Sequence, residues 1–533
     1  MTAPRQSGRP APEALDEALR ANPTLNAASI DGTVLAPIVA YAFRRLEDLP
    51  EATEAAVRAA LKRRGGARAG TFFAGALRAP GRRVILEVKA ASPSRGLMRS
   101  EIDLADYART LNRFADAVSV LTEPKFFGGS FERLAALRPL VAKPLLAKDF
   151  FIDERQALAA AEAGADAILL MLSVLSDAGY RRLAAFADRL GLEVLTEAST
   201  PDELERARAL GARVIGVNNR NLRTLEVDLS RAPALAAGLP LGPDAPVVVA
   251  ESGYRTAADM EAACAKAPAI AAFLCGSALS LSKDLSTGVR ELLHGRSKVC
   301  GITRAGDALA AAEAGATSVG VILAERSRRC VAPDEAAGLA SAIRGKCIGA
   351  NLPVELCAVA DAEELERPAL LETLRSVAPD VLQIHGAADA FSPEFLSRIA
   401  KHLPGVKLAP ALGLGGLDEA DAQALARRIR ALLEAGLIDR AVLDNSAPGT
   451  ASGGTGRRFN PALLEAFRDV PRLVVAGGLA AENAREAFRR GVLSGAGVLG
   501  LDFNSGVEIR PGVKDAARIR ETFAALRGLG APA

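Results

Sequence analysis

Short apolar runs alternate with longer stretches rich in Ala, Leu and Arg along most of the chain. The runs have the length and the β-branched composition of strands, and the stretches between them have the length of helices. Apolar and polar positions do not alternate cleanly within the runs, as expected for parallel strands buried on both faces. In the first half, the predicted strands are 84–89, 117–121, 144–148, 167–172, 193–197, 214–218, 246–251 and 271–276.

The same alternation starts again near residue 298 and continues to the end of the chain. The predicted strands of this second set are 298–301, 318–322, 347–350, 381–384, 407–410, 440–444, 472–476 and 497–502. The third is ambiguous, because the segment 347–359 fits a strand in either of its halves. Eight strand–helix units in each half match a closed barrel better than an open sheet. The sequence therefore predicts an α/β protein with two tandem (β/α)8 TIM barrels.

The residues before the first strand predict a tail and a helical extension. Residues 1–30 are rich in Pro, Ala and Arg, which is typical of a mobile tail. Apolar positions recur at helical spacing from Thr33 to Phe43, and residues 51–64 predict a second helix. Because the strand pattern restarts near residue 298, we expect one barrel over 31–294 and the other over 295–533.

Composition narrows the class of protein. The chain has 533 residues, 24% of them charged, with a net charge of +3, so it lacks the basic footprint of a nucleic-acid-binding protein. Aromatic residues make up only 4% and Trp is absent, which leaves few rings to stack on bases. No apolar run approaches the roughly 20 residues of a membrane span, and the first residues lack the apolar core of a signal peptide. We expect a cytoplasmic protein without nucleic-acid or membrane partners.

The six cysteines show neither a CxxC spacing nor an accompanying His pattern. A disulfide framework and a metal site are therefore not expected, and a reducing compartment fits best. Of the six, only Cys300 stands where a predicted strand ends among other polar residues.

Polar residues gather where the predicted strands of the first half end. In a (β/α)8 barrel these ends form one mouth, which carries the active site. Glu87 and Lys89 lie two apart on the first strand, so their side chains share a face. Taken alone, such a pair is more often a structural ion pair. The later strand ends, however, add Lys148-Asp149-Phe150, Thr196-Glu197, Asn218-Asn219-Arg220, Glu251-Ser252-Gly253 and Gly276-Ser277.

This combination predicts a phosphorylated, acidic substrate that undergoes proton transfers. The Ser-Gly and Gly-Ser pairs follow the seventh and eighth strands, where backbone N–H groups commonly bind phosphate. A lysine that is desolvated or placed near other cations becomes a usable acid at neutral pH. The two lysines of this mouth are therefore candidate acids.

The strands of the second half end in different polar residues. Cys300 follows the first strand, Gln383 and His385 end the fourth, and Asp444 ends the sixth. Glycine-rich segments follow the sixth, seventh and eighth strands, at 453–456, 477–478 and 505–506. A thiol acts as a base only as the thiolate, so its free pKa of about 8.5 must be lowered by cations or dipoles. Taken alone, a strand cysteine more often fills a core, and a lone histidine is more often structural.

These residues lie in longer motifs that resemble two known enzyme families. The first half resembles indole-3-glycerol phosphate synthase through LEVKAASPSRG, SVLTEPKFFGGS, LLAKDFFID, VLTEAS, GVNNRNL, VAESG and LCGSAL. The second half is similar to phosphoribosylanthranilate isomerase through KVCGITR, SRRCV, LQIHG, VLDNS, SGGTGRRF, VAGGL and LDFNSGVE. In this order, the motifs resemble the fused bifunctional enzymes of tryptophan biosynthesis.

For the first barrel, the resemblance implies decarboxylation and dehydration of carboxyphenylamino-deoxyribulose phosphate to indole-3-glycerol phosphate. Lys148 would be the general acid and Glu197 the base of the dehydration. Lys89 would hold the anthranilate carboxylate, and Glu87 would orient polar groups beside it. The resemblance adds catalytic contacts at Asn218 and Ser252, substrate contacts at Ser92, Pro93, Phe127, Phe150, Arg220, Leu222 and Glu251, and phosphate contacts at Gly253, Gly276 and Ser277.

For the second barrel, the resemblance implies an Amadori rearrangement of phosphoribosylanthranilate, with Cys300 as base and Asp444 as acid. It adds substrate contacts at Arg329, Gln383 and His385 and phosphate contacts at Gly454, Gly478, Ser505 and Gly506. It also implies a monomer without a cofactor or metal, whose partners are phosphorylated anthranilate sugars. The alternatives are an inert metabolite-binding second barrel and a different phosphosugar isomerase. Retention of both Cys300 and Asp444 favours the two-activity enzyme.

Overall fold

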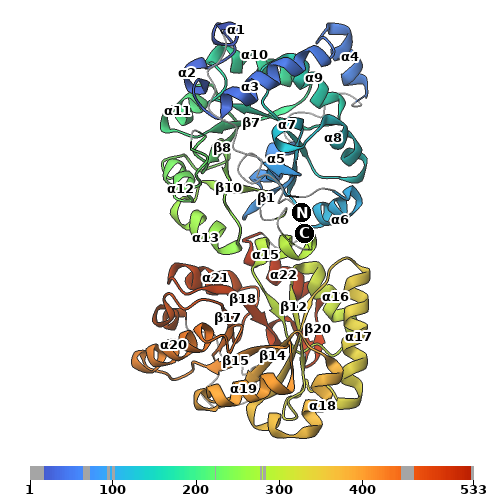
Figure 1. The fold of residues 1–533 in the computed structure, drawn as a ribbon, viewed down its shortest axis with the longest axis vertical. Coiled ribbons are helices and arrows are strands. Elements are labelled where there is room, and N and C mark those ends of the chain that lie inside the picture. Colours follow the sequence, from blue (N-terminus) through green and yellow to red (C-terminus); the bar gives the residue numbers. More distant parts are fainter. Residues whose placement is uncertain are drawn as a thin grey trace, which may run out of the picture. The chain divides into compact units, whose positions relative to one another are not determined.

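The computed structural model describes residues 17–63, 72–92, 96–98, 102–222, 224–276, 279, 282, 284–445 and 461–529. The chain forms two compact units. One extends to Arg255 and resumes over Ala263–Leu285, and the other takes Thr256–Ala262 and the chain from Ser286 onward. Each unit contains a closed barrel of parallel strands with helices around it (Figure 1). The predicted pair of TIM barrels is confirmed.

The first barrel pairs its strands in chain order and closes where the first strand meets the last. Its strands are β1 (Arg83–Val88), β4 (Ala117–Leu121), β5 (Leu145–Lys148), β6 (Ala167–Met171), β7 (Glu193–Ala198), β8 (Val214–Asn218), β9 (Val247–Glu251) and β10 (Ile270–Cys275). Every residue of β4, β6, β8 and β9 is buried, which explains the lack of alternation in the sequence.

Helices connect the strands of the first barrel. They include α6 (Leu104–Phe114), α7 (Pro124–Phe127), α8 (Phe131–Leu137), α9 (Glu154–Glu162), α10 (Asp177–Arg189), α11 (Pro201–Ala209), α12 (Arg231–Ala236) and α13 (Ala257–Lys266). Several begin at a side-chain cap. Asp153 and Gln156 form a capping box at the start of α9, and the carboxylate of Glu123 accepts from three backbone N–H groups of α7. These caps fix where each helix begins, just beyond the mouth of the barrel.

The N-terminal extension is longer than predicted. It contains α1 (Glu17–Arg20), α2 (Ala27–Ile30), α3 (Leu35–Arg44), η1 (Arg45–Asp48), α4 (Glu54–Arg63) and α5 (Phe72–Arg78). Leu19, Leu25 and Ile30 are buried, and the N–H of Asn26 donates to the carbonyl of Val174. The predicted mobile tail is therefore wrong for residues 17–30, where a few widely spaced apolar residues anchor the chain. Residues 1–16 lie outside the described residues.

The second barrel has the same closed, sequential order. Its strands are β11 (Lys298–Val299), β12 (Ser318–Ile322), β13 (Glu355–Asp361), β14 (Val381–His385), β15 (Lys407–Gly413), β16 (Ala441–Asp444), β17 (Leu473–Ala476) and β18 (Val498–Phe503). Its helices include α15 (Leu285–His294), α16 (Ala305–Ala314), α17 (Pro333–Gly349), α18 (Pro368–Val377), α19 (Pro393–His402), α20 (Glu419–Glu434), α21 (Ala484–Leu493) and α22 (Ala516–Leu526). No helix within the described residues is both long and apolar enough to span a membrane.

One predicted strand is wrong. Residues 347–350 belong to the end of α17 and its cap, and the third strand is β13, in the second half of the ambiguous segment. The buried residues Ala336, Ala340, Ile343 and Cys347 recur at helical spacing. Cys347 therefore completes the buried face of a helix.

The predicted domain boundary after His294 stays a prediction, and the two compact units divide before most of α15. The second unit resumes at Ser286, so α15 belongs to it almost entirely, whereas the predicted boundary follows His294. The buried guanidinium of Arg290 donates to the carbonyls of Ala316 and Pro353, which explains the difference. These buried hydrogen bonds hold α15 to the second unit.

Candidate active sites

The first cavity lies at the carboxyl ends of the strands of the first barrel and encloses about 1090 Å³, including space open to solvent. It is lined by Glu87, Lys89, Ser92, Phe127, Lys148, Phe150, Glu197, Asn218, Arg220, Leu222, Ser252, Gly253 and Gly276. Glu251 joins this group through a contact with Lys148. Pro93 and Ser277 lie outside the described residues. The structure thus gathers nearly all the residues predicted for this mouth.

Lys148 occupies the centre of a buried charge cluster. Its Nζ lies 3.2 Å from Glu87 Oε2 and 3.4 Å from Glu251 Oε2. The other oxygen of Glu87 accepts from Lys89 Nζ at 2.6 Å. Two positions without side chains make room for these groups. A Cβ at Gly216 would overlap Glu251 Oε1, and one at Gly276 would overlap Glu87 Oε1.

The cluster shifts the pKa values of its members in opposite directions. Burial alone would raise the pKa of Glu87, but Lys148 and Lys89 outweigh it and lower that pKa to about 2. Burial alone would lower the pKa of Lys148, but Glu87, Glu251 and Glu197 raise it above its ordinary value. The expectation that burial makes Lys148 a stronger acid is therefore wrong, because its neighbours are carboxylates.

Glu251 differs from Glu87 in its pKa and in the hydrogen bonds that its carboxylate makes. Burial raises its pKa, although Lys148 opposes this effect. Its Oε1 has no hydrogen-bond partner among the described residues. Glu251 is therefore the member of the cluster that takes up a proton most readily.

A second set of contacts orients Glu197. Asn218 Nδ2 donates to Glu197 Oε1 at 3.1 Å, and Asn218 Oδ1 accepts from the backbone N–H of Arg220 at 2.9 Å. Both Glu197 and Asn218 are buried at the ends of neighbouring strands. The carboxylate is thus held in one orientation at the cavity wall.

Apolar side chains form the remaining wall. The rings of Phe127 and Phe150 lie 6.1 Å apart, close enough to hold a planar ring beside them. The helix α3 adds Val34, Leu35 and Ile38 to the lining. The apolar spacing from Thr33 to Phe43 predicts this helix but gives it no part in the site. The N-terminal extension therefore completes the wall of the cavity. In the sequence, the apolar face of this helix is the one feature that points to this role.

The turn after β9 exposes backbone N–H groups. Ser252 and Gly253 both have positive φ angles, 67° and 93°. Ser252 is held there by Asn219, whose Nδ2 donates to its carbonyl at 3.0 Å. Successive residues of this kind turn their N–H groups to one side and form an anion-binding concavity. A non-glycine residue in this region is strained, and such strain is concentrated at functional sites.

The second cavity lies at the corresponding end of the second barrel and encloses about 600 Å³. Six of the predicted residues line it: Cys300, Gln383, His385, Asp444, Gly478 and Ser505. It is also lined by Gly477, from a predicted glycine-rich segment, and by Asp361, Asp502 and Asn504, to which no role was assigned. Gly506 packs against the carbonyl of Leu479, and Gly454 lies outside the described residues.

Cys300 lies beside a buried ion pair. Lys298 Nζ is 2.7 Å from Asp502 Oδ2 and donates to Gln383 Oε1 at 2.5 Å. Burial, together with Asp502, outweighs the opposing effect of Lys298 and Lys514, so the pKa of the Cys300 thiol is raised above its ordinary value. The thiol is thus desolvated and faces cations.

The turn after β17 supports Asp444 from the neighbouring strand. Gly477 and Gly478 both have positive φ angles, 100° and 61°. A Cβ at Gly477 would lie 2.7 Å from the backbone N of Asn445 and 3.1 Å from Asp444 Oδ1. Only glycine therefore fits beside the carboxylate, and the two turns leave N–H groups at the cavity.

His385 is neutral at physiological pH. Burial, reinforced by Lys298, lowers its pKa to about 4. Its Nε2 is 3.1 Å from Gln383 Nε2, and both side chains project from β14 to the same face. The imidazole therefore contributes a polar wall without a charge.

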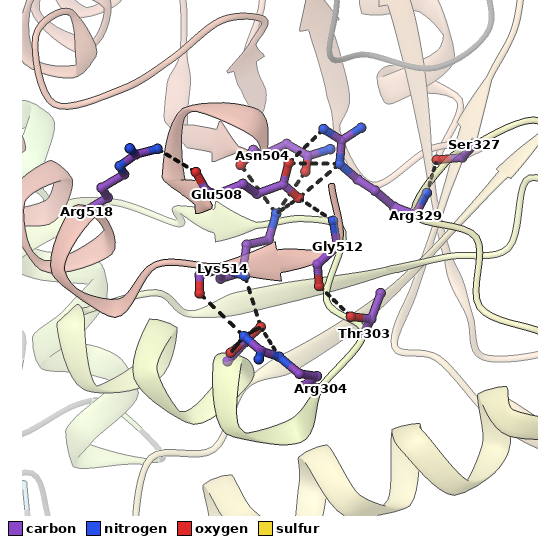
Figure 2. A network of polar contacts seen from close by, with 10 residues as sticks. Thr303, Arg304, Ser327, Arg329, Asn504, Glu508, Gly512, Lys514 and Arg518 are labelled. Carbon is purple, nitrogen blue, oxygen red and sulfur yellow. Dashed lines mark hydrogen bonds and ion pairs between the residues drawn. The ribbon is translucent and has the colours of Figure 1, made fainter. Parts of the chain in front are cut away.

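Arg329 belongs to the polar network of Figure 2 and lies outside the set of described residues that line the cavity. Its Nε and Nη2 donate to both carboxylate oxygens of Glu508 at 2.7–3.1 Å. Glu508 also accepts from Lys514 Nζ at 2.8 Å and from the N–H of Gly512 at 3.0 Å. The guanidinium is thus fixed along one edge by a carboxylate of its own chain.

The sequence places Lys298 and Asp502 on predicted strands without giving either a role, although a signal exists. Lys298 and Cys300 lie two apart, the spacing that identified Glu87 and Lys89 on the first strand. Lys298 also stands opposite Asp502 in the pairing of β11 with β18. That register follows from barrel closure and is not visible in the sequence alone.

Comparison with known proteins agrees with this geometry. Residues 38–292 match the family model of indole-3-glycerol phosphate synthase, and residues 297–525 match that of N-(5'-phosphoribosyl)anthranilate isomerase. The tryptophan biosynthesis protein TrpCF of Vibrio parahaemolyticus is 39% identical over 83% of this chain and 84% of its own length. TrpCF of Vibrio cholerae is 40% identical over 83% of this chain and 86% of its own. The crystal structure of the phosphoribosylanthranilate isomerase of Thermotoga maritima is 30% identical, covers 44% of this chain and 100% of its own, and has a TM-score of 0.35.

Two barrels, two separate acid–base cavities and relatives that match along both halves lead to one conclusion. The chain belongs to the TrpCF family of bifunctional tryptophan-biosynthesis enzymes, which join an indole-3-glycerol phosphate synthase to a phosphoribosylanthranilate isomerase.

Proposed function

We propose that Cys300 and Asp444 carry out the isomerase reaction as its base and acid. Both side chains line one cavity, from strands on different sides of the same barrel, and this observation carries the proposal. Asp444 protonates the ribose ring oxygen of phosphoribosylanthranilate, so the C1–O bond breaks and the sugar opens to a protonated imine. Cys300 then removes the C2 proton, and the resulting enolamine becomes the amino-ketone product.

Substrate binding in this cavity rests on residues at its rim. Arg329 binds the anthranilate carboxylate with the guanidinium edge opposite Glu508, because a planar fork suits a carboxylate. The phosphate binds the N–H groups of Gly478, Ser505 and Gly506, together with Gly454. Gln383 and His385 hold the sugar hydroxyls. The neutral state of the imidazole fits a site whose product carries no positive charge at the sugar.

In the first cavity, Lys148 and Glu197 act as acid and base of the ring closure. Lys148 protonates the substrate carbonyl as the aromatic carbon attacks it, and loss of CO2 restores the ring. Glu197 then removes a proton from the carbon next to the departing hydroxyl, which leaves as water with a proton supplied through Lys148. Glu251 takes up a proton and passes it to Lys148 after that lysine has protonated the substrate, because Glu251 contacts the lysine and its pKa is raised by burial.

The other residues of the first cavity hold the substrate in a reactive shape. Lys89, oriented by Glu87, binds the carboxylate that is later lost. Phe127, Phe150 and Leu222 enclose the aromatic ring. Ser252, Asn218, Arg220 and Ser92 with Pro93 fix the sugar chain, and Gly253, Gly276 and Ser277 bind phosphate. Holding the two reacting carbons together contributes up to about 7–11 kcal/mol to such reactions.

We further propose a cytoplasmic monomer that needs no cofactor, because every step above is a proton transfer or a bond rearrangement within one substrate. All six cysteines lie within the described residues and none is joined in a disulfide, which suits a reducing compartment. Size-exclusion chromatography with light scattering tests the oligomeric state. A mass of two chains would contradict the monomer.

The decisive assay for the isomerase half follows the loss of phosphoribosylanthranilate fluorescence. We expect turnover by the wild-type protein and loss of turnover in Cys300→Ala and Asp444→Asn, with ring closure unchanged in both. Cys264→Ala, which lies outside the second cavity, is the matched control. Binding without turnover by the wild-type protein would instead make the second barrel a metabolite-binding module.

A further inference from the structure

The guanidinium of Arg329 is bound along one of its edges by the chain itself. Its Nε and Nη2 donate to the carboxylate of Glu508, and the shortest of these contacts measures 2.7 Å. A guanidinium carries five N–H donors in a planar fork. Within the described residues, Nη1 of Arg329 donates to no acceptor. The end edge of the fork, between Nη1 and Nη2, is therefore open to a second carboxylate.

The stem of Arg329 lies next to the second cavity. A Cβ at Gly301, the residue after Cys300, would lie 2.8 Å from Arg329 Cδ and 2.7 Å from Asn504 Oδ1. Cys300 and Asn504 both line that cavity. The guanidinium is therefore carried on a stem that packs against the cavity wall. The orientation of its open edge decides which group it can bind there.

Glu508 is itself held in place by several donors (Figure 2). Its Oε1 accepts from Lys514 Nζ at 2.8 Å and from the N–H of Gly512 at 3.0 Å. Its main chain pairs with that of Lys514 in the antiparallel hairpin of β19 (Glu508–Arg510) and β20 (Val513–Lys514). A carboxylate fixed in this way has one orientation. The guanidinium that binds it through two N–H groups is then fixed as well.

The carboxylate of Glu508 is shared by two buried cations. Arg329 and Lys514 both contact it, and the three side chains are between 0% and 7% exposed. Burial alone would raise the pKa of Glu508, but Arg329 and Lys514 outweigh it and hold that pKa below its ordinary value. Glu508 is therefore ionised. One carboxylate shared by two cations leaves Arg329 able to take a second anion.

The hairpin that carries Glu508 has other attachments to the barrel. The backbone N–H of Lys514 donates to Asp307 Oδ2 at 3.1 Å, and the hydroxyl of Thr303 donates to the carbonyl of Gly512. These contacts hold the hairpin to the segment that follows β11. The bidentate contact between Glu508 and Arg329 is therefore more than the hairpin needs for its own attachment.

We propose that Glu508 is a positioning residue that orients Arg329 toward the carboxylate on the aromatic ring of the substrate. Glu508 occupies the side edge of the guanidinium, and the ring carboxylate takes its end edge. Lys514 and Gly512 hold Glu508 and so define where the ring carboxylate lies relative to Cys300. The inference rests on the proposed role of Arg329 and adds the residue that makes the site selective for a carboxylated ring.

The test compares two competitive inhibitors of the isomerase reaction of the full-length enzyme. One is the reduced product, in which the ketone has become an alcohol, and the other is the same compound without the ring carboxylate. In Glu508→Gln, the amide offers N–H donors where Arg329 and Lys514 need acceptors, so the guanidinium loses its alignment. The inhibition constant of the carboxylated compound should rise about 10–100-fold, as expected for loss of a hydrogen bond between charged groups. That of the other compound should stay unchanged.

Two further variants separate the orientation of Arg329 from other effects. Arg329→Met should cause the same selective loss, and adding Glu508→Gln to it should cause no further loss, because the effect passes through the guanidinium. Glu486→Gln, which breaks an exposed ion pair with Arg490 on α21, is the matched control and should change neither inhibition constant. The unchanged constant of the compound without the carboxylate shows that the second barrel is folded.

The outcomes distinguish the positioning role from the proposed function. Equal losses for both inhibitors in Glu508→Gln, or no loss for either, would overturn the positioning role. Wild-type affinity of Arg329→Met for the carboxylated compound would instead overturn the proposed carboxylate contact. If Glu508→Gln does not fold, Glu508→Asp decides, because it keeps the charge beside Lys514 but is too short to reach Arg329 with both oxygens. The same selective loss would then support the proposal, and unchanged constants would overturn it.

Discussion

Replacing Lys148 with Ala removes the ammonium shared by two buried carboxylates of the first cavity. Lys148 Nζ lies 3.2 Å from Glu87 and 3.4 Å from Glu251, so both lose a partner at once. Glu87 keeps Lys89 at 2.6 Å and stays ionised. Glu251, whose pKa is already raised by burial, takes up a proton. The variant therefore keeps a neutral, packed cluster, but without the acid.

The expected magnitudes follow from this arrangement. Loss of a general acid lowers kcat by about 10²–10⁴-fold, which corresponds to about 3–5 kcal/mol on the barrier. Breaking a buried ion pair costs about 3–5 kcal/mol of stability when the remaining charge has no partner. Because Glu87 keeps a partner and Glu251 becomes neutral, we expect a stability loss at or below about 3 kcal/mol. Catalysis should suffer far more than folding.

The assay measures both reactions on one purified variant. Ring closure is followed by formation of the indole product from carboxyphenylamino-deoxyribulose phosphate, and isomerisation is followed by loss of phosphoribosylanthranilate fluorescence. Lys62→Ala, at an exposed position on α4, is the matched control. A fall in ring-closure kcat of less than 10-fold would refute Lys148 as the acid. A parallel fall in isomerisation would refute the independence of the two cavities.

Three further predictions test single contacts. Gly216→Ala places a Cβ on Glu251 Oε1, so the rate of ring closure should fall at least 10-fold while isomerisation is unchanged. A ring-closure rate equal to that of the wild-type protein would contradict the close packing of Glu251 against Gly216. Gly477→Ala strains a positive-φ position and displaces Asp444, so kcat of the isomerase should fall with little change in ring closure. Burial lowers the pKa of His385 from 6.5 to about 4, so the unfolded chain binds a proton first as pH falls. Stability is then fully present above pH 6.5, and about 3 kcal/mol is lost toward pH 4. Chemical denaturation of His385→Gln should lack this loss, and an identical pH dependence would contradict it.

Much of the fold follows from local pattern. The buried runs of β4, β8 and β12 carry enough β-branched and apolar residues to mark both of their ends. The predicted position of the third strand of the second barrel is wrong because the segment around Cys347 has the composition of a strand. Its buried residues nevertheless continue the spacing of a helix. Periodicity outweighs composition where the two disagree.

Site residues could be predicted where they belong to a family motif or lie two apart on one strand. Contacts between residues that only the closed barrel brings together could not be predicted. Glu87 with Lys89 follows from spacing on one strand. The pairing of Lys298 with Asp502 joins the first strand to the last, and that of Arg329 with Glu508 joins residues 179 apart. Such contacts are set by the closed ring and leave no local trace.

The central claim is that each barrel holds a complete and separate acid–base set. Its most direct test is an equimolar mixture of Lys148→Ala and Cys300→Ala chains supplied with phosphoribosylanthranilate. We predict that neither variant alone forms indole-3-glycerol phosphate, whereas the mixture does, because one supplies isomerisation and the other ring closure. Product formation by either variant alone, or an inactive mixture of folded chains, would contradict the claim.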